Sequence, residues 1–121
     1  MLLASKILLG AIGALMIFFG GRWMFAPDAI MREHDISTNT ATGKNYLRGD
    51  MGGLLIGGGA AIFMFLYQGM VWALPILVII GAVMLGRIVS LIADGKSKQG
   101  LMALGIELAI VLLVIGIAGL S

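Results

Sequence analysis

The sequence contains no cysteine, a single histidine and few charged residues. The absence of cysteine excludes disulfides, thiol chemistry, iron–sulfur clusters and cysteine-ligated zinc. The lone His34 has no second histidine with which to complete a haem or di-iron ligand set. We therefore predict no cofactor, no metal site and no catalytic constellation, and an enzymatic function is disfavoured.

Charge is scarce in a chain that is otherwise rich in apolar residues. Of the 121 residues, 60% are hydrophobic, 19 are glycine and only 12% are charged, and the mean hydropathy is +1.10. A water-soluble domain of this length cannot bury so many apolar side chains, because small folds leave much of their surface exposed. The composition excludes a soluble globular enzyme, a disordered protein and a nucleic-acid-binding protein. It indicates a small integral membrane protein in contact with membrane lipids.

Four apolar runs are each close to the roughly 20 residues that a helix needs to cross a bilayer. They cover approximately residues 2–24, 47–67, 71–93 and 101–120. The later runs are joined by only Gln68-Gly69-Met70 and by residues 94–100, and such short links force neighbouring helices to be antiparallel. We expect the first run to be retained as a helix, since no small-residue cleavage site follows it. The sequence thus predicts an all-α fold, a four-helix transmembrane bundle formed by one domain over residues 1–121.

The only long connection, residues 25–46, has two interpretations. Pro27 followed by Asp28 is typical of a helix start. Ile30 and Met31, next to charged residues, indicate one or two turns of helix at the membrane interface. The simpler alternative, which we favour, is a solvated connector.

The basic residues predict the orientation of the bundle. With four spans, the first and third loops lie on one side of the membrane and both termini lie on the other. The side of the loops carries Arg22, Arg32, Lys44, Lys96 and Lys98, whereas the other side carries Lys6 and the α-amino group. Because cytoplasmic loops carry an excess of lysine and arginine, loops one and three are predicted to be cytoplasmic, with both termini outside.

One pair of opposite charges lies inside the predicted spans. Arg87 in the third span and Glu107 in the fourth are each ten positions from a hairpin centre near Ser97. At a rise of about 1.5 Å per residue, both lie roughly 9 Å inside the same membrane face. A lone charge at that depth is costly, so such residues face inwards and find partners. We predict a charge-assisted contact between Arg87 and Glu107.

Further polar residues are expected at the same membrane face. With the pair they form one predicted cluster, which comprises Arg22, Arg48, Asp50, Arg87, Ser90, Asp94 and Glu107. Its three positive and three negative charges balance. Three interpretations are open: an ionic network that fixes helix register, a polar-headed pocket for an amphiphile such as a lipid, a quinone or a fatty acid, or a proton relay.

Glycine recurs along the second span. Gly49, Gly53, Gly57 and Ala61 are four residues apart and form one row of small residues. Such a row lets two membrane helices approach closely. We predict helix packing within the bundle at this row, with a dimer interface or a ligand groove as the alternatives.

Several motifs carry a family resemblance. They are Phe25-Ala26-Pro27, the segment Leu47 to Gly53, Gly86-Arg87 with Ser90-Leu91 and Asp94-Gly95, and Glu107. In these motifs the chain resembles an uncharacterised family of short bacterial four-helix membrane proteins, classified as a domain of unknown function. The resemblance covers most of the chain from about Phe25, and it implies a location in the bacterial inner membrane.

More distantly, the architecture is similar to DoxX-like four-helix proteins. Those include quinone-linked oxidoreductase subunits and NACHO-type receptor-assembly chaperones, so the resemblance implies accessory or assembly roles as much as catalysis. We predict an accessory or scaffold subunit that packs against other membrane helices or against itself, and that can hold a lipid-like amphiphile near Arg87 and Glu107. The alternative is a small transporter, such as a proton-coupled carrier, or a quinone-linked redox subunit.

Overall fold

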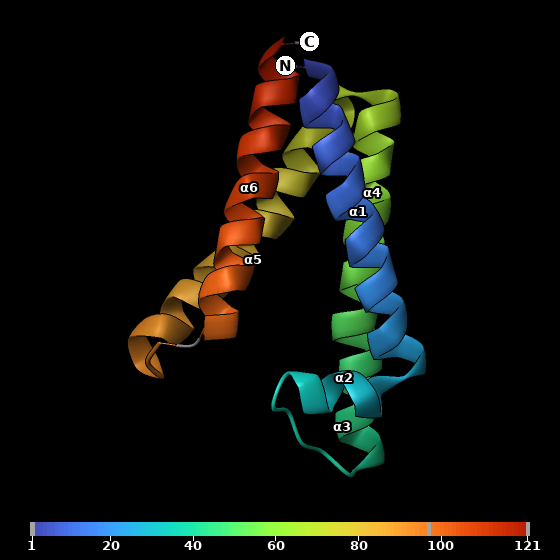
Figure 1. The fold of residues 1–121 in the computed structure, drawn as a ribbon, viewed down its shortest axis with the longest axis vertical. Helices are drawn as coiled ribbons and strands as arrows, with labels where there is room; N and C mark the ends of the chain where they lie inside the picture. The colour runs from blue at the N-terminus through green and yellow to red at the C-terminus, as the bar shows by residue number, and fades with distance from the viewer. Residues whose placement is uncertain (1, 97, 121) are drawn as a thin grey trace.

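The chain is helical, and its four long helices form two antiparallel pairs that diverge from one end of the molecule (Figure 1). The computed structural model describes residues 2–96 and 98–120, so the predicted hairpin centre at Ser97 and the two terminal residues of the predicted domain lie outside the described residues. In chain order the helices are α1 (Leu2–Phe25), α2 (Pro27–Glu33), α3 (Ala41–Tyr46), the π-helix η1 (Leu47–Gly53), α4 (Leu54–Gln68), the 3-10 helix η2 (Met70–Trp72), α5 (Ala73–Ala93) and α6 (Lys98–Leu120). The described part of the chain contains no strand, so the predicted all-α fold is confirmed.

Four helical segments are long and apolar enough to cross a membrane. They are Leu2–Phe25, Ala41–Gln68, Met70–Ala93 and Gly100–Gly119. Large apolar side chains cover their outer surfaces; Leu74 and Ile92, for example, are 70% and 82% exposed. Such surfaces are unfavourable in water and suit a lipid environment. The chain is therefore a small multi-pass membrane protein.

The two pairs of helices meet at the end where α1 begins and α6 ends. Side chains from all four long helices form one buried core there, which includes Leu9, Ile62, Phe65, Ile76 and Val114. Helix α6 is the member of the second pair that packs along α1. This core holds the two pairs together at one end of the molecule.

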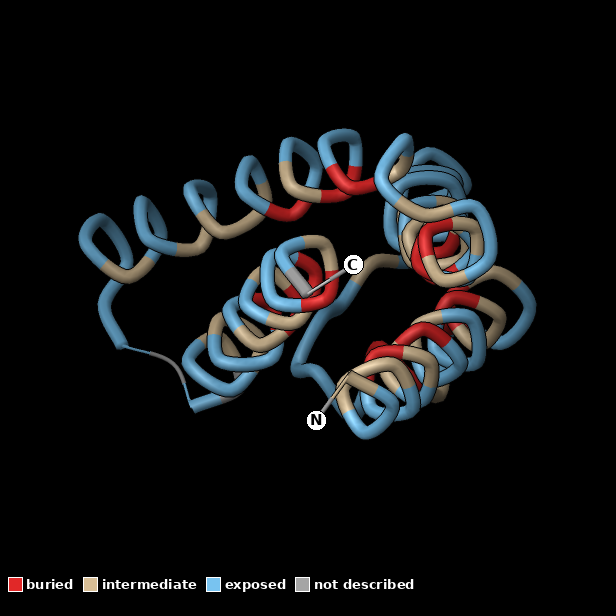
Figure 2. The backbone as a smooth tube through the Cα atoms, turned by 90° about the horizontal axis from the view of Figure 1, so that it is seen from above, coloured by how far each residue is buried: buried red, intermediate tan, exposed pale blue. Residues whose placement is uncertain are grey.

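Away from that core the pairs separate. Ala73, Ile76 and Ile80 of α5 are buried, whereas the residues between Ile80 and the end of the helix at Ala93 are half-buried or exposed. Figure 2 shows that the buried residues of α5 lie at the end nearest α4. The predicted bundle is thus closed at one end and open at the other, and we refer to the α1/α4 and α5/α6 pairs as its two arms.

A tight turn at Gly69 connects the arms. Gly69 has a φ of 83°, a conformation that glycine adopts readily because it lacks a Cβ atom. Its N–H donates to the carbonyl oxygen of Phe65 at 2.8 Å, and its own carbonyl oxygen accepts from the Trp72 N–H at 3.1 Å. The turn reverses the chain between α4 and α5 in very few residues.

Helices α1 and α4 approach closely because glycines face each other across their contact. A Cβ atom on Gly59 would lie 2.5 Å from the carbonyl oxygen of Gly13, and one on Gly20 would lie 2.8 Å from that of Gly52. Only glycine fits such backbone contacts. Gly13 and Gly20 of α1 are seven residues apart, as are Gly52 of η1 and Gly59 of α4, a spacing expected for helices that stay in contact over two turns.

The predicted row of small residues does not make this contact. A Cβ atom on Gly49, Gly53 or Gly57 would meet nothing within 4 Å, whereas Ala61 is partly buried against the core. The prediction of packing within the bundle is therefore wrong for these three glycines. The reason is helix rotation, which turns the other glycines of this segment towards α1.

The second span begins earlier than the predicted residue 47. Helices α3, η1 and α4 follow one another without a break from Ala41 to Gln68. Thr40 sets the start, because its Oγ1 accepts a hydrogen bond from the Gly43 N–H at 2.9 Å. Within the span, η1 is a π-helix, a wider form that is frequent at functional sites.

The long connection is partly helical. Pro27 is the first residue of α2, as its position before Asp28 indicated. Ile30 and Met31 are buried against Trp23 at the end of α1. Because α2 docks in this way, the structure favours the helical interpretation over the solvated connector.

Candidate functional site

Arg87 and Glu107 lie on the faces of α5 and α6 that turn towards the core. Arg87 is seven residues beyond Ile80, which is buried, and so it lies on the same side of α5. Glu107 shares its face of α6 with Ile110 and Val114, which are 2% and 0% exposed. Helical periodicity therefore directs both charged side chains to the interior of the α5/α6 arm.

The two side chains are in direct contact. Arg87 Nε donates a hydrogen bond to Glu107 Oε1 at 2.5 Å, which is also an ion pair. The contact follows from antiparallel packing of α5 and α6, in which residues at equal distances from the connecting turn lie at the same level. A charge-assisted bond of this kind is stronger than one between neutral groups.

The contact leaves polar atoms of both partners unused. Glu107 Oε2 is buried and has no hydrogen-bond partner among the described residues. In the same part of the chain Arg87 bonds through Nε alone, and a guanidinium group has four more N–H donors on its two terminal nitrogens. The side chain of Arg87 is 36% exposed, against 10% for Glu107. Arg87 is therefore the more accessible member of the pair.

The remaining residues of the predicted cluster are not brought to this pair. Arg22 binds Glu33 of α2 instead, with Nη2–Oε1 and Nη1–Oε2 distances of 2.6 and 3.0 Å. At the end of α5, on the same arm as the pair, Ser90 Oγ donates a hydrogen bond to Asp94 Oδ2 at 3.0 Å. These contacts do not support the interpretation as one six-charge ionic network, because the diverging arms separate Arg22, Arg48 and Asp50 from the α5/α6 arm.

Arg48 and Asp50 belong to the α1/α4 arm as well. Arg48 Nη1 donates to the carbonyl oxygen of Met24 at 2.6 Å, which ties η1 to the end of α1. Asp50 is exposed on η1. Both residues thus lie apart from the Arg87–Glu107 pair, and Arg48 stabilises the contact between two helices of one arm.

Glu33 is a partner that the sequence interpretation missed. The hydrogen bond from Arg22 holds the pKa of the Glu33 carboxyl below its usual value, against a smaller opposing effect of desolvation. The signal for this contact was the short helix predicted from Pro27. Because α2 packs against Trp23, Glu33, the last residue of α2, comes within reach of Arg22.

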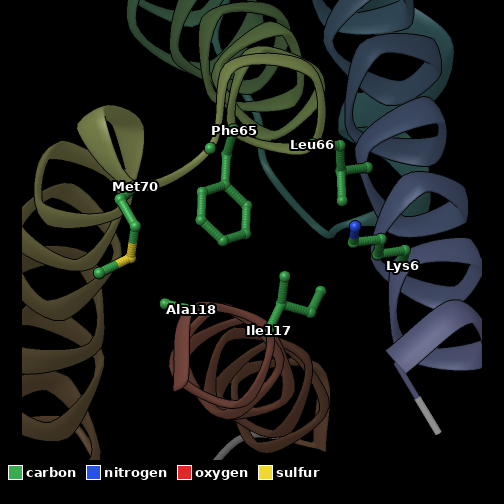
Figure 3. A pocket seen from close by; sticks show the side chains of 7 residues that line it. Lys6, Phe65, Leu66, Met70, Ile117 and Ala118 are labelled. Atoms are coloured by element: carbon green, nitrogen blue, oxygen red, sulfur yellow. The ribbon is translucent and has the colours of Figure 1, made fainter. Parts of the chain in front are cut away.

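A second, smaller feature lies at the closed end of the molecule. A cavity of about 50 Å³ is lined by Lys6, Phe65, Leu66, Gly69, Met70, Ile117 and Ala118 (Figure 3). Lys6 lies near the C-terminal ends of α4 and α6, where a positive charge is favourable. This volume has room for a few water molecules but not for an amphiphile.

The arrangement around Arg87 is suited to binding an anion. The terminal nitrogens of a guanidinium group match the two oxygens of a carboxylate or phosphate group. Residues 2–96 and 98–120 contain no cluster of three side chains that could hold a metal ion.

Comparison with known proteins places the chain in a family. No curated protein and no solved structure gives a significant match. The family model for a domain of unknown function, DUF4345, matches residues 4–118. Because this match spans almost the whole four-helix domain, the chain belongs to the DUF4345 family.

Proposed function

We propose that this protein is an accessory subunit of a membrane-protein complex and that it holds an anionic amphiphile at the open end of its α5/α6 arm. The observation that carries the proposal is Arg87, a partly exposed cation inside a membrane span whose terminal nitrogens have no hydrogen-bond partner among the described residues while Nε is bound to Glu107. A guanidinium group held in this way presents its donors to a phosphate or carboxylate head group.

Glu107 supports this role by fixing the guanidinium group. Its carboxylate occupies Nε and leaves the outer end of the group, formed by the two terminal nitrogens, without a bond to Glu107. Arg87 lies about six residues, or roughly 9 Å, from the end of α5, a depth from which an arginine can reach towards the head-group region. The pair is neutral overall, so the arm remains compatible with lipid before the anion binds.

Apolar side chains suitable for contact with acyl chains lie beside the site. Val83, Met84 and Leu91 share the Arg87 face of α5 and are half-buried, and Ile88 and Ile106, each next to a member of the pair in sequence, are 42% and 53% exposed. A polar head group on Arg87 would place its tails along these side chains. A partner helix can pack on the same surface, which connects lipid binding with an accessory role.

Lipid retention tests the proposal. Native mass spectrometry of protein released from nanodiscs of phosphatidylglycerol and phosphatidylcholine should show the wild-type chain retaining the acidic lipid. Arg87→Gln should lower that retention at least about tenfold, since a charge-assisted hydrogen bond contributes roughly 1.5–3 kcal/mol. Lys98→Gln is the matched control, because Lys98 is an exposed cation on the same arm and its loss should leave retention unchanged. Equal retention by wild type and Arg87→Gln would refute the proposal.

A proton-coupled carrier is the second candidate, and the buried Oε2 of Glu107 favours it. An unbonded carboxylate oxygen inside a membrane span is a group that can take up a proton. Proton uptake by proteoliposomes that Glu107→Gln abolishes would select this function. If vesicles that contain the wild-type protein take up no more protons than empty vesicles, the carrier function is excluded and the accessory function remains.

We also propose that loops one and three face the cytoplasm of a bacterial cell and that the protein lies in its inner membrane. The basic residues of those loops support this orientation. Since the chain has no cysteine, single-cysteine variants give an unambiguous test. In intact spheroplasts a membrane-impermeant maleimide should label Met70→Cys, in the α4–α5 link, and label Ser37→Cys only after permeabilisation. The reverse pattern would invert the topology.

A further inference from the structure

A polar pocket lies at the start of the second span, where α2, the following loop and α3 meet. Its volume is about 380 Å³, within the range of roughly 300–1,000 Å³ that is typical of small-molecule sites. The polar side chains that line it are Asp28, Arg32, Ser37, Thr38, Asn39 and Lys44, and Met31 and Ile36 form its apolar part. The Arg87–Glu107 pair is not part of this pocket.

The loop that forms the pocket has a defined conformation. Asp35 adopts a φ of 55°, which turns the chain back after α2, and the Ile36 N–H donates to the carbonyl oxygen of Met31 at 2.9 Å. The side chain of Thr40 caps α3. A Cβ atom at Gly43 would collide with the hydroxyl group of Thr38. Close packing of the loop on α3 therefore fixes where its hydroxyl groups lie.

The charges of the pocket favour an anion. Lys44 Nζ lies 3.2 Å from Asp28 Oδ1, so these two charges offset each other. Arg32 adds a second cation that is exposed to solvent. Glu33, the next residue of α2, is bound to Arg22. The pocket thus has a net positive charge and neutral donors from Ser37, Thr38 and Asn39.

We propose that this pocket binds a phosphate ester. Guanidinium and ammonium groups combined with hydroxyl and amide donors match the several acceptor oxygens of a phosphate group. Helix α2 packs on Trp23 at the end of the first span, so the pocket lies beside the membrane surface, where basic sites bind acidic lipid head groups. A soluble phosphate ester has the same chemistry, and the test below separates the two sources. The proposal is independent of ligand binding at Arg87.

Binding is measured on the full chain in nanodiscs, by NMR shifts of the backbone amides of Ser37 and Thr38. In phosphatidylcholine nanodiscs, sn-glycerol 1-phosphate is titrated from solution. In a second series, phosphatidylglycerol replaces part of the phosphatidylcholine. Shifts in both series indicate a phosphate site open to solutes, and shifts only with phosphatidylglycerol indicate a head-group site.

Variants decide whether the pocket causes the shifts. Arg32→Gln should weaken binding at least about tenfold, because it removes one charge-assisted hydrogen bond. The affinity of Arg32→Lys should lie between that of Arg32→Gln and that of the wild type. Asp28→Asn should strengthen binding, because it removes the opposing charge. Lys96→Gln, an exposed cation on the other arm, is the control. The proposal is overturned if neither series gives shifts, if Arg32→Gln binds as Lys96→Gln does, or if Asp28→Asn fails to strengthen binding.

Discussion

Replacing Gly59 with alanine is expected to lower the free energy of unfolding by about 2–3 kcal/mol, the upper range for overpacking a tight contact. The added Cβ atom would lie 2.5 Å from the carbonyl oxygen of Gly13 and 2.7 Å from Ile17 Cγ1. A backbone carbonyl cannot move aside as a flexible side chain can. The α1 and α4 helices would therefore have to separate, which weakens their whole contact. Unfolding in mixed detergent micelles, followed by circular dichroism, measures the loss.

Gly57→Ala is the matched control for that substitution. Gly57 lies two residues away in the same helix, but a Cβ atom there would meet nothing within 4 Å. Alanine in a helix interior is favoured over glycine by roughly 0.5–1 kcal/mol, so the control should be as stable as the wild type or more so. Equal losses for both variants would mean that Gly57 also packs closely, as in a homodimer.

Removing either member of the Arg87–Glu107 pair is expected to cost about 3 kcal/mol, because it leaves one charge uncompensated inside a span. Arg87→Met and Glu107→Leu are suitable single changes, since both new side chains are apolar and of similar length. The double variant should lie within about 1 kcal/mol of the wild type, because replacing a whole ion pair by apolar groups is often close to neutral. The same unfolding assay completes the cycle.

The double-mutant cycle separates folding from ligand binding. If the two single losses add up in the double variant, the side chains do not interact and the contact at 2.5 Å is not formed in the membrane. If the cycle shows strong coupling, the double variant becomes a folded protein without the guanidinium group. It should then fail to retain acidic lipid although its stability is near that of the wild type.

The pair could be predicted from the sequence because it depends on few variables. Hydropathy places the spans, and a short link makes the third and fourth antiparallel. Equal distances from the link then put Arg87 and Glu107 at one level. The high cost of charge in lipid supplies the reason for contact.

The glycine contact and the wider cluster depend on variables that no local pattern contains. Two glycine rows overlap in the second span, and the rotation of the helix decides that Gly52 and Gly59, rather than Gly53 and Gly57, face α1. The angle between the arms decides whether Arg22 meets residues of α5. That angle comes from packing at the closed end, about 30 Å along the helices from the open one. The pocket beside α3 was missed because a loop turned at Asp35 creates it.

In the proposed site the terminal nitrogens of Arg87 bind an anionic head group while Nε remains on Glu107. Magic-angle-spinning NMR of ¹⁵N-arginine-labelled protein in phosphatidylglycerol bilayers measures the distance from these nitrogens to lipid ³¹P. We predict a coupling that corresponds to a direct hydrogen bond, with nitrogen–oxygen distances of about 2.7–2.9 Å, and its loss in Arg87→Gln. A full arginine spectrum without a ³¹P coupling at Arg87 would contradict the claim.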